Sequence, residues 1–376
     1  MFRHYAFGAI FLWLMAAMPL MAANKKALHI KAQLQGVGDT LVVIHGEEQT
    51  LFTGHNGTFD FLLPLPHAMY IEAATPASFR GEEQQFFRLP AVPGETVEIK
   101  GTLPADWTVS GSRFYADYQA LITEVMVAEQ PLSDLTASLN QQILDGGNRD
   151  SLQQVYNQMQ PAMLKTQNDA LLAIVRRHAD NPVVAVMTAE MNGDIPMMQQ
   201  AIALMARPVR EGRVRQLVYG PLEQAKMQRD SEEASARKQA AGVEVPDFTL
   251  TDIHGQALQL SSLRGRYVLL DFWGSWCGWC KEGFPQMRRQ YEQYKDKFEI
   301  LGIDCRDSQE AWRQTVKEFD LPWLHVYCPD DSSVFEAYGI IAFPTKILIG
   351  PDGKIVKTFV GEDPLYYSLI DELFGE

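Results

Sequence analysis

The sequence predicts an α/β domain at the C-terminus, preceded by a β-sandwich-like domain and a helical segment. From residue 25 to 110, short β-branched and aromatic runs alternate with Gly, Asn and Pro, as in antiparallel strands. From 111 to about 241, apolar residues recur three and four positions apart, as in helices. From 243 to 376, strand-like and helix-like runs follow one another, which is typical of α/β domains.

Length and composition are those of a globular protein. The chain has 376 residues, enough for two or three domains, and 46% of them are hydrophobic and 21% charged. The formal net charge is −14, and the chain lacks the clustered Lys and Arg that engage a phosphate backbone. We therefore expect no nucleic-acid partner, whereas the oligomeric state is left open.

Residues 1–23 have the pattern of a secretory signal peptide. A basic start, "MFRHY", leads into an apolar stretch and then to the small residues Ala22 and Ala23. The mature chain is then expected to begin near Asn24 and to work in the periplasm or elsewhere in the cell envelope, where disulfides persist. An uncleaved membrane anchor is the alternative, because bulky Met21 lies three positions before the cleavage point.

Residues 24–110 are expected to form the β-rich domain. Runs such as "ALHIKAQL", "DTLVVIHG" and "GETVEIKG" lie between turn signals, and "GHNG" before "TFDF" favours a hairpin. Four histidines here are interpreted as surface or strand-face residues: His29, His45, His55 and His67. A metal site is the alternative, but no two of them have ligand spacing on one strand.

Residues 111–242 are expected to be helical and to end in a linker. Helical periodicity covers "FYADYQALITEVMVA" and "SLQQVYNQMQPAMLKTQNDALLAIVRRHA", with turn signals at "DGGN" and "DNP". The frequent methionines are interpreted as core filler, rather than as a surface for metal or haem. The polar stretch "QRDSEEASARKQAAG" is expected to be an exposed helix end or a tether into the last domain.

Residues 243–376 are expected to form the α/β domain. The strand-like runs are "YVLLDFW", "FEILGID", "LHVYC" and "TKILIG", and helical stretches begin near Cys280 and Ser308. Continuous apolar strands interleaved with helices predict a largely parallel sheet that is covered on both faces. The turn "GPDGKIV" is expected to join the last two strands as a hairpin, and "PLYYSLIDELF" to close the domain as a helix.

Two cysteines in the stretch "DFWGSWCGWC", Cys277 and Cys280, are the main candidates for chemistry. A structural zinc site needs four ligands, usually in two close pairs, and the other two cysteines of the chain are single. A purely structural disulfide would stabilise little, because it closes a short loop. The strand before the pair and the helix after it favour redox chemistry, because a thiolate is stabilised at a helix N-terminus.

This placement predicts separate roles for three residues. Cys277 is expected to be the exposed nucleophile that attacks a partner's disulfide, and Cys280, one turn deeper and more buried, to resolve the mixed disulfide. Asp271, six positions before Cys277 in an apolar run, is expected to be buried with a raised pKa and to accept the proton of Cys280. The alternative for Asp271 is a surface carboxylate at a strand edge.

These motifs resemble those of a known family. The stretches "VLLDFWGSWCGWCKEGFP" and "AFPTKILIGPDGKIV", with the lead-in "VPDFTLTDIHGQALQLSSLRGR", are similar to the TlpA/ResA-like branch of thioredoxin-fold thiol-disulfide oxidoreductases, whose domain is of the AhpC/TSA/TlpA type. The resemblance covers 243–376 and assigns no function to the β-rich module. It implies a thioredoxin fold, a cis peptide bond before Pro344, and backbone groups of Phe343 that pair with an extended substrate. Many members of this branch carry Asn where this chain has Asp271.

The resemblance extends to activity and partners. We assign substrate binding to residues around the pair: Trp276, Gly278, Trp279, Phe343 and Pro344. The expected function is reduction of disulfides in secreted or periplasmic proteins, with no cofactor besides the redox-active disulfide itself. Reduction is favoured because the Gly-Trp dipeptide between the cysteines lacks the histidine of strong oxidants. The expected partners are protein disulfides and an upstream thiol electron donor, for which a membrane-bound protein is one alternative.

Two alternatives concern the remaining cysteines and the whole domain. Cys305 and Cys328 each end a strand-like run, and on parallel neighbouring strands they would either form a second disulfide or remain two thiols. The alternative to an enzyme is a non-catalytic module that grips extended polypeptide and keeps the pair as a structural disulfide. A peroxidase is less favoured, because no isolated Cys in a Pro-x-x-x-Thr-type loop precedes the pair.

Overall fold

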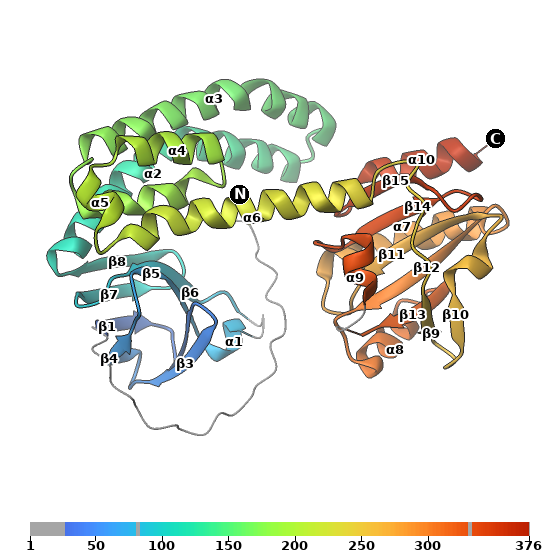
Figure 1. The fold of residues 1–376 in the computed structure, drawn as a ribbon, viewed down its shortest axis with the longest axis horizontal. Helices are drawn as coiled ribbons and strands as arrows, with labels where there is room; N and C mark the ends of the chain where they lie inside the picture. The colour runs from blue at the N-terminus through green and yellow to red at the C-terminus, as the bar shows by residue number, and fades with distance from the viewer. Residues whose placement is uncertain (1–26, 80–82, 330–332, 376) are drawn as a thin grey trace. The chain divides into compact units, whose positions relative to one another are not determined.

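The computed structural model describes residues 27–79, 83–329 and 333–375. The chain divides into two compact units, the first ending at Lys226 and the second beginning at Met227 (Figure 1). The predicted signal peptide lies outside the described residues. Within the described ranges, no helix is both long enough and apolar enough to span a bilayer.

The first unit contains a β-sandwich of two four-stranded sheets, with strand orders β4-β1-β7-β8 and β3-β2-β5-β6. Strands β1 and β7 are parallel, and the other paired strands are antiparallel. The elements are β1 (Ala27–Gln35), β2 (Thr40–His45), β3 (Glu48–Thr53), β4 (Thr58–Pro64), β5 (Met69–Ala74), α1 (Pro76–Phe79), β6 (Phe86–Ala91), β7 (Thr96–Thr102) and β8 (Asp106–Gly111). The turn "GHNG" lies between β3 and β4, but the expected hairpin is absent, because these two strands belong to different sheets and the turn carries the chain from one sheet to the other.

Helices complete the first unit and share its core. They are α2 (Arg113–Leu144), α3 (Arg149–Arg177), the 3-10 helix η1 (Pro182–Met191), α4 (Ile195–Leu204), α5 (Arg207–Glu211) and the first half of α6 (Arg215–Lys238), a helix that continues past Lys226 into the second unit. Strand residues such as Leu28 and helix residues such as Val175 and Val218 belong to one continuous buried cluster. The predicted boundary at residue 110 therefore separates two kinds of secondary structure inside one compact unit.

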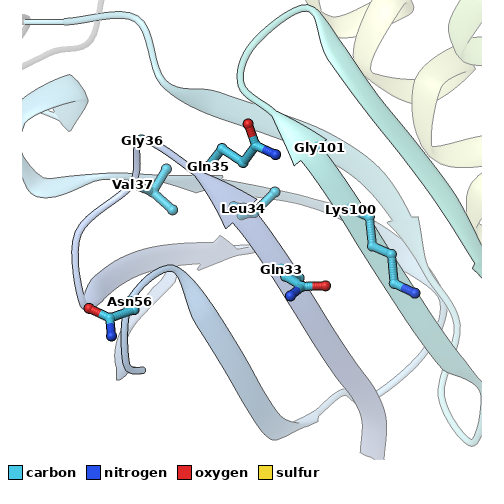
Figure 2. Close-up of a pocket in the computed structure, with 8 residues that line it drawn as sticks. All are labelled: Gln33, Leu34, Gln35, Gly36, Val37, Asn56, Lys100 and Gly101. Carbon is cyan, nitrogen blue, oxygen red and sulfur yellow. The ribbon is translucent and has the colours of Figure 1, made fainter.

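A hollow opens beside β1 and β7 in the first unit (Figure 2). Its polar side chains come from Gln33, Gln35, Asn56 and Lys100. Lys100 is the only titratable residue of its lining, so the hollow contains no nucleophile with an adjacent base. We therefore assign no chemistry to it.

The second unit is built on a seven-stranded sheet with the order β10-β9-β13-β12-β11-β14-β15. Its elements are β9 (Thr249–Asp252), β10 (Ala257–Gln259), the 3-10 helix η2 (Leu260–Leu263), β11 (Tyr267–Trp273), α7 (Gly278–Tyr294), β12 (Phe298–Cys305), α8 (Gln309–Glu318), β13 (Leu324–Cys328), α9 (Ser333–Tyr338), β14 (Thr345–Ile349), β15 (Ile355–Val360) and α10 (Pro364–Phe374). This is the α/β thioredoxin fold that the sequence predicts, with β14 and β15 as the expected hairpin and α10 as the closing helix (Figure 1).

The expectation of a largely parallel sheet is wrong. Strands β11, β12 and β13 are parallel, but β14 is antiparallel to β11, and β9 is antiparallel to β13. The short connections within β9–β10 and β14–β15 allow only antiparallel pairing, because a parallel partner needs a long crossover. Both faces are nevertheless covered: residues of α7, α8 and α10 lie in the buried cluster on one face, and residues of η2 and α9 in the cluster on the other.

The polar stretch 228–242 is helical up to Lys238, and its end is anchored rather than exposed. Ser235 and Gln239 are buried. The Ser235 hydroxyl donates to the Gly339 carbonyl at 2.6 Å, and Gln239 Nε2 donates to the Tyr338 carbonyl at 3.0 Å. Of the two alternatives, the exposed helix end is wrong at Ser235 and Gln239, because the last carbonyls of α9 need donors and the side chains of α6 supply them. A tether into the last domain, by contrast, agrees with a helix that crosses the boundary at Lys226.

Candidate active site

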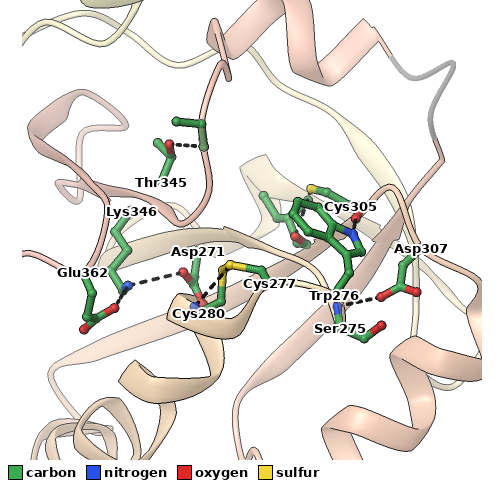
Figure 3. Close-up of a disulfide and its surroundings, with 12 residues drawn as sticks. Asp271, Ser275, Trp276, Cys277, Cys280, Cys305, Asp307, Thr345, Lys346 and Glu362 are labelled. Carbon is green, nitrogen blue, oxygen red and sulfur yellow. Dashed lines mark hydrogen bonds and ion pairs between the residues drawn. A yellow bond between two sulfur atoms is a disulfide. The ribbon is translucent and has the colours of Figure 1, made fainter. Parts of the chain in front are cut away.

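The two cysteines of the Trp-Cys-Gly-Trp-Cys stretch lie where strand β11 passes into helix α7. Cys277 is the N-cap of α7, and its sulfur accepts a hydrogen bond from the Cys280 backbone N–H at 3.2 Å. The two residues form a disulfide with their Cα atoms 5.3 Å apart (Figure 3). The predicted strand–turn–helix context is therefore present, with Cys277 at the positive end of the helix dipole.

Cys277 is more exposed than Cys280, as expected, but both cysteines are more buried than the sequence suggests. Cys277 is 6% exposed and Cys280 is 2% exposed. Both belong to the buried cluster that also contains Trp273 and Phe284. The expectation of a freely exposed Cys277 is thus wrong for the oxidised form, because aromatic packing around the first turn of α7 reaches the disulfide. Cys277 still has the larger solvent-accessible part of the pair.

Asp271 is buried in β11 on the face of the sheet that α7 covers, so the surface-carboxylate alternative is excluded. Its side chain is 1% exposed, and neither carboxylate oxygen has a hydrogen-bond partner among the described residues. Burial raises the pKa of Asp271 from 3.8 to about 6; the Lys346 ammonium opposes this rise and the Glu362 carboxylate adds to it. Figure 3 shows the contact between this carboxylate and the Lys346 ammonium on the same side of the sheet as the disulfide.

Lys346 and Glu362 complete this cluster, and the sequence reasoning missed both. Lys346 lies on β14, opposite Asp271 in the antiparallel register, and its side chain is 1% exposed. Its Nζ is 2.7 Å from Glu362 Oε2 and 4.0 Å from Asp271 Oδ1. A charged residue in the apolar run "TKILIG" is the same signal that pointed to Asp271, whereas Glu362, in the turn after β15, shows no comparable signal.

Aromatic residues and the loop before β14 surround the pair. Trp276 is 41% exposed, donates its indole N–H to the Cys305 carbonyl at 3.0 Å, and packs edge-on against Phe343 with ring centroids 5.2 Å apart. Trp279 is 61% exposed. The Phe343–Pro344 peptide bond is cis, which confirms what the resemblance implied. Gly274 matters here, because a Cβ at this position would lie 2.4 Å from the Trp276 indole nitrogen.

Gly278 forms the first residue of α7, and a Cβ there would meet open space, so steric fit does not explain this glycine. With Trp276, Trp279, Phe343 and Pro344 it makes up the set that the sequence assigned to substrate binding. The Trp276–Phe343 contact joins two members of that set from distant parts of the sequence. A partly exposed aromatic surface therefore adjoins the buried disulfide.

Two further buried titratable residues, Asp304 and His325, lie on the α7 face of the sheet. Burial, with the Asp307 carboxylate nearby, raises the pKa of Asp304 to about 9. Burial lowers the pKa of His325 to about 4. Both side chains are therefore neutral at pH 7, and they add no charge beside Asp271. Their signal was again a polar residue inside an apolar run, in "ILGIDC" and "LHVYC".

Cys305 and Cys328 are opposite each other on the parallel strands β12 and β13, as the sequence suggested. Both are buried on the opposite face of the sheet from Asp271, and no disulfide joins them in the described structure. Burial and the neighbouring Cys328 thiol raise the pKa of Cys305 well above its usual value. The structure thus favours the interpretation as two thiols.

Metal binding was the alternative for the histidines of the β-rich domain. The described residues contain no group of three or more His, Cys, Asp or Glu side chains arranged to hold a metal ion. His29 instead contacts Asp60, with its Nε2 2.5 Å from Oδ1, and His45 bonds to the Thr50 hydroxyl at 3.0 Å. These contacts are those of ordinary strand-face histidines.

Comparison with known proteins places the likeness in the second unit. The AhpC/TSA family model matches residues 241–358. Thiol-disulfide oxidoreductase ResA of Bacillus thuringiensis subsp. konkukian is 36% identical over 126 residues, which are 33% of this chain and 72% of the relative. ResA of Bacillus subtilis is 37% identical over 121 residues, or 32% of this chain and 67% of the relative. A solved thioredoxin domain of a thiol-disulfide oxidoreductase from Bacteroides vulgatus is 33% identical, covers 36% of this chain and 99% of its own, and has a TM-score of 0.34.

Proposed function

The chain belongs to the ResA-like thiol-disulfide oxidoreductases, and we propose that it reduces disulfides of secreted or periplasmic proteins with its Cys277–Cys280 dithiol. The observation that carries the proposal is the pair itself, with one cysteine as the N-cap of α7 and the other one turn further in, together with the buried carboxylate of Asp271 on the sheet face that α7 covers. A dithiol at a helix N-terminus yields a reactive thiolate at the first position and a protected second thiol.

The first step is attack on the substrate. The Cys277 thiolate attacks one sulfur of the substrate disulfide, a new S–S bond forms, and the other substrate sulfur leaves as a thiolate that takes a proton from solvent. The N-terminal N–H groups of α7, including the Cys280 N–H that points at the Cys277 sulfur, stabilise the attacking thiolate. The Gly278–Trp279 dipeptide contributes no charge there, so a moderately reducing couple is expected.

The second step closes the disulfide of the enzyme. Asp271 accepts the proton of Cys280, the Cys280 thiolate attacks the Cys277 sulfur, and the substrate leaves with its second sulfur as a thiolate. Two electrons pass from the dithiol to the substrate. A base with a pKa of about 6 suits this role, because it is mostly ionised at pH 7 and still accepts a proton more readily than an ordinary carboxylate.

Substrate binding is assigned to the surface next to the disulfide. The exposed indoles of Trp276 and Trp279 offer apolar contact area, and the loop before β14 offers the backbone groups of Phe343, next to the cis Pro344, to a polypeptide. An extended segment around the substrate cystine is the occupant that fits this surface. We place the protein in the cell envelope, where an upstream thiol donor would restore its dithiol.

The experiment compares cysteine variants in insulin reduction and in trapping of mixed disulfides. Cys277→Ser should abolish insulin reduction, whereas Cys280→Ser should accumulate a covalent adduct with a disulfide substrate. Cys328→Ala, which removes a buried thiol on the other face of the sheet, is the matched control and should keep activity. Full activity of either active-site variant would overturn the proposal.

The alternative function, a polypeptide-binding module with a structural disulfide, makes a different prediction. Equilibration of the full chain with glutathione couples of known potential measures how readily Cys277–Cys280 is reduced. A catalytic pair should become reduced above about −300 mV, whereas a structural disulfide stays oxidised below that value.

A further inference from the structure

Lys346 is a buried cation between two carboxylates, and its ammonium lies closer to one of them than to the other. Its side chain is 1% exposed, and its ammonium lies 2.7 Å from Glu362 Oε2 but 4.0 Å from Asp271 Oδ1. A lysine is almost never this buried unless it is paired. The short contact identifies Glu362 as the main partner, so Asp271 receives only part of the compensation that one ammonium can give.

Glu362 is held firmly in this position. The Tyr367 hydroxyl donates to Glu362 Oε1, and Lys346 donates to Oε2. The carboxylate lies against α7 at Gly283, where an added Cβ would be 2.4 Å from Oε2. Gly283 is inside the helix, where glycine is destabilising by roughly 1 kcal/mol relative to alanine, so the glycine is explained by the space that Glu362 needs.

We propose that Glu362, by holding Lys346 away from Asp271, sets how readily Asp271 takes the proton of Cys280. This inference rests on the proposed function, because it concerns the base of the resolving step. With the ammonium bound to Glu362, the Asp271 carboxylate remains poorly compensated and therefore basic. If Glu362 lost its charge, the ammonium would serve Asp271 alone, and Asp271 would become a weaker base. Glu362 and Lys346 are positioning residues, since neither is assigned contact with the substrate.

The charges that face Asp271 are few in the described part of the chain. Lys346 comes from β14, Glu362 from the turn after β15, and the hydroxyls of Tyr366 and Tyr367 from α10. Burial raises the pKa of both tyrosines, so they stay neutral. Also neutral at pH 7 are the groups on the neighbouring strands β12 and β13: Asp304, Cys305 and His325. Lys346 and Glu362 are thus the charged residues that dominate the electrostatic potential at the Asp271 carboxylate and at the two cysteines of α7.

The direct test is a titration of the Asp271 carboxyl carbon by NMR in the oxidised full chain, with the signal assigned by its loss in Asp271→Asn. Glu362→Gln should lower the midpoint by about one pH unit, and Lys346→Met should raise it by about one unit or more. Glu372→Gln, which removes the same charge from an exposed position on α10, is the control and should leave the midpoint unchanged. Glu362→Asp, which keeps the charge but draws it back from Lys346, should lower the midpoint by a smaller amount and serves if Glu362→Gln does not fold.

A kinetic measurement then connects the titration to the reaction. The rate at which a preformed mixed disulfide on Cys277 is resolved should follow the same midpoint, displaced to lower pH in Glu362→Gln. An unchanged or raised Asp271 midpoint in the Glu362 variants would overturn the inference. A lowered midpoint, together with insulin reduction that survives loss of Cys277, would leave the coupling intact and overturn the proposed function instead.

Discussion

Replacing Asp271 by Asn should stabilise the second unit at neutral pH. The carboxylate is buried, has no hydrogen-bond partner among the described residues, and receives only partial compensation from Lys346 at 4.0 Å. Its pKa is about 6 in the folded protein, against the ordinary 3.8 of an aspartate side chain. A difference of roughly two units at 1.36 kcal/mol each corresponds to about 3 kcal/mol of destabilisation once Asp271 is ionised.

The sign follows from the protons that the two states bind. Between about pH 4 and pH 6, the folded protein keeps a proton on Asp271 that the unfolded chain has lost, so the stability of the native protein falls as the pH rises through this window. At pH 4 both Asp271 and Asn are neutral, and the two proteins should have similar stability. The advantage of Asp271→Asn should then grow to about 3 kcal/mol by pH 7.

Urea unfolding of the oxidised full chain, followed by tryptophan fluorescence at several pH values, measures this difference. Five of the seven tryptophans lie between 273 and 323, so the signal reports mainly on the second unit. Glu372→Gln provides a control for loss of one exposed charge. A stability difference between Asp271→Asn and the native protein that is the same at pH 4 and pH 7 would refute the linkage argument. A less stable variant at pH 7 would refute it as well.

Three other predictions follow from buried or exposed side chains. Burial lowers the pKa of His325 from 6.5 to about 4. The stability that the neutral imidazole contributes is therefore present above pH 6.5 and is lost as the pH falls toward 4, because the unfolded chain then binds a proton that the folded protein does not. This loss of about 3 kcal/mol should be absent from the urea unfolding of His325→Phe. In the reduced native protein, iodoacetamide should modify Cys277 and spare Cys305 and Cys328, which are 0% exposed, whereas mass spectrometry after denaturation should find all four cysteines modified. Trp279→Ala should raise the KM for a polypeptide disulfide and leave the reaction of Cys277 with a small aromatic disulfide unchanged; equal effects on both substrates would contradict a role in binding polypeptide.

Much of the site could be read from local patterns. The stretch "YVLLDFW" has the apolar run of a buried strand, so its single acidic residue, Asp271, had to be buried with it. The Cys-x-x-Cys pair follows directly and begins a helix, which places Cys277 at the N-cap. The exposure of Cys277 was misjudged, because the disulfide belongs to a buried cluster that includes aromatic residues from distant elements, such as Tyr366 of α10.

The burial of the end of the polar stretch 228–242 could not be predicted from the sequence. The composition of this stretch is that of a solvated helix, and most of its residues are indeed exposed. Ser235 and Gln239 are buried because Gly339, which is 104 and 100 positions further along the chain, presents its carbonyl to them. No periodicity within the stretch carries that information.

By itself, the sequence determined the strand, the turn, the helix and the position of the two cysteines at the start of that helix, because neighbouring residues decide each of these. The tertiary structure alone decided the electrostatics around Asp271. Lys346 faces Asp271 only through the antiparallel register of β14 and β11, and Glu362 reaches Lys346 only because the β14–β15 hairpin and α10 return the chain to α7. The field at a buried carboxylate depends on charges a few ångströms away in space, and strand pairing, a long-range property, brings those charges there.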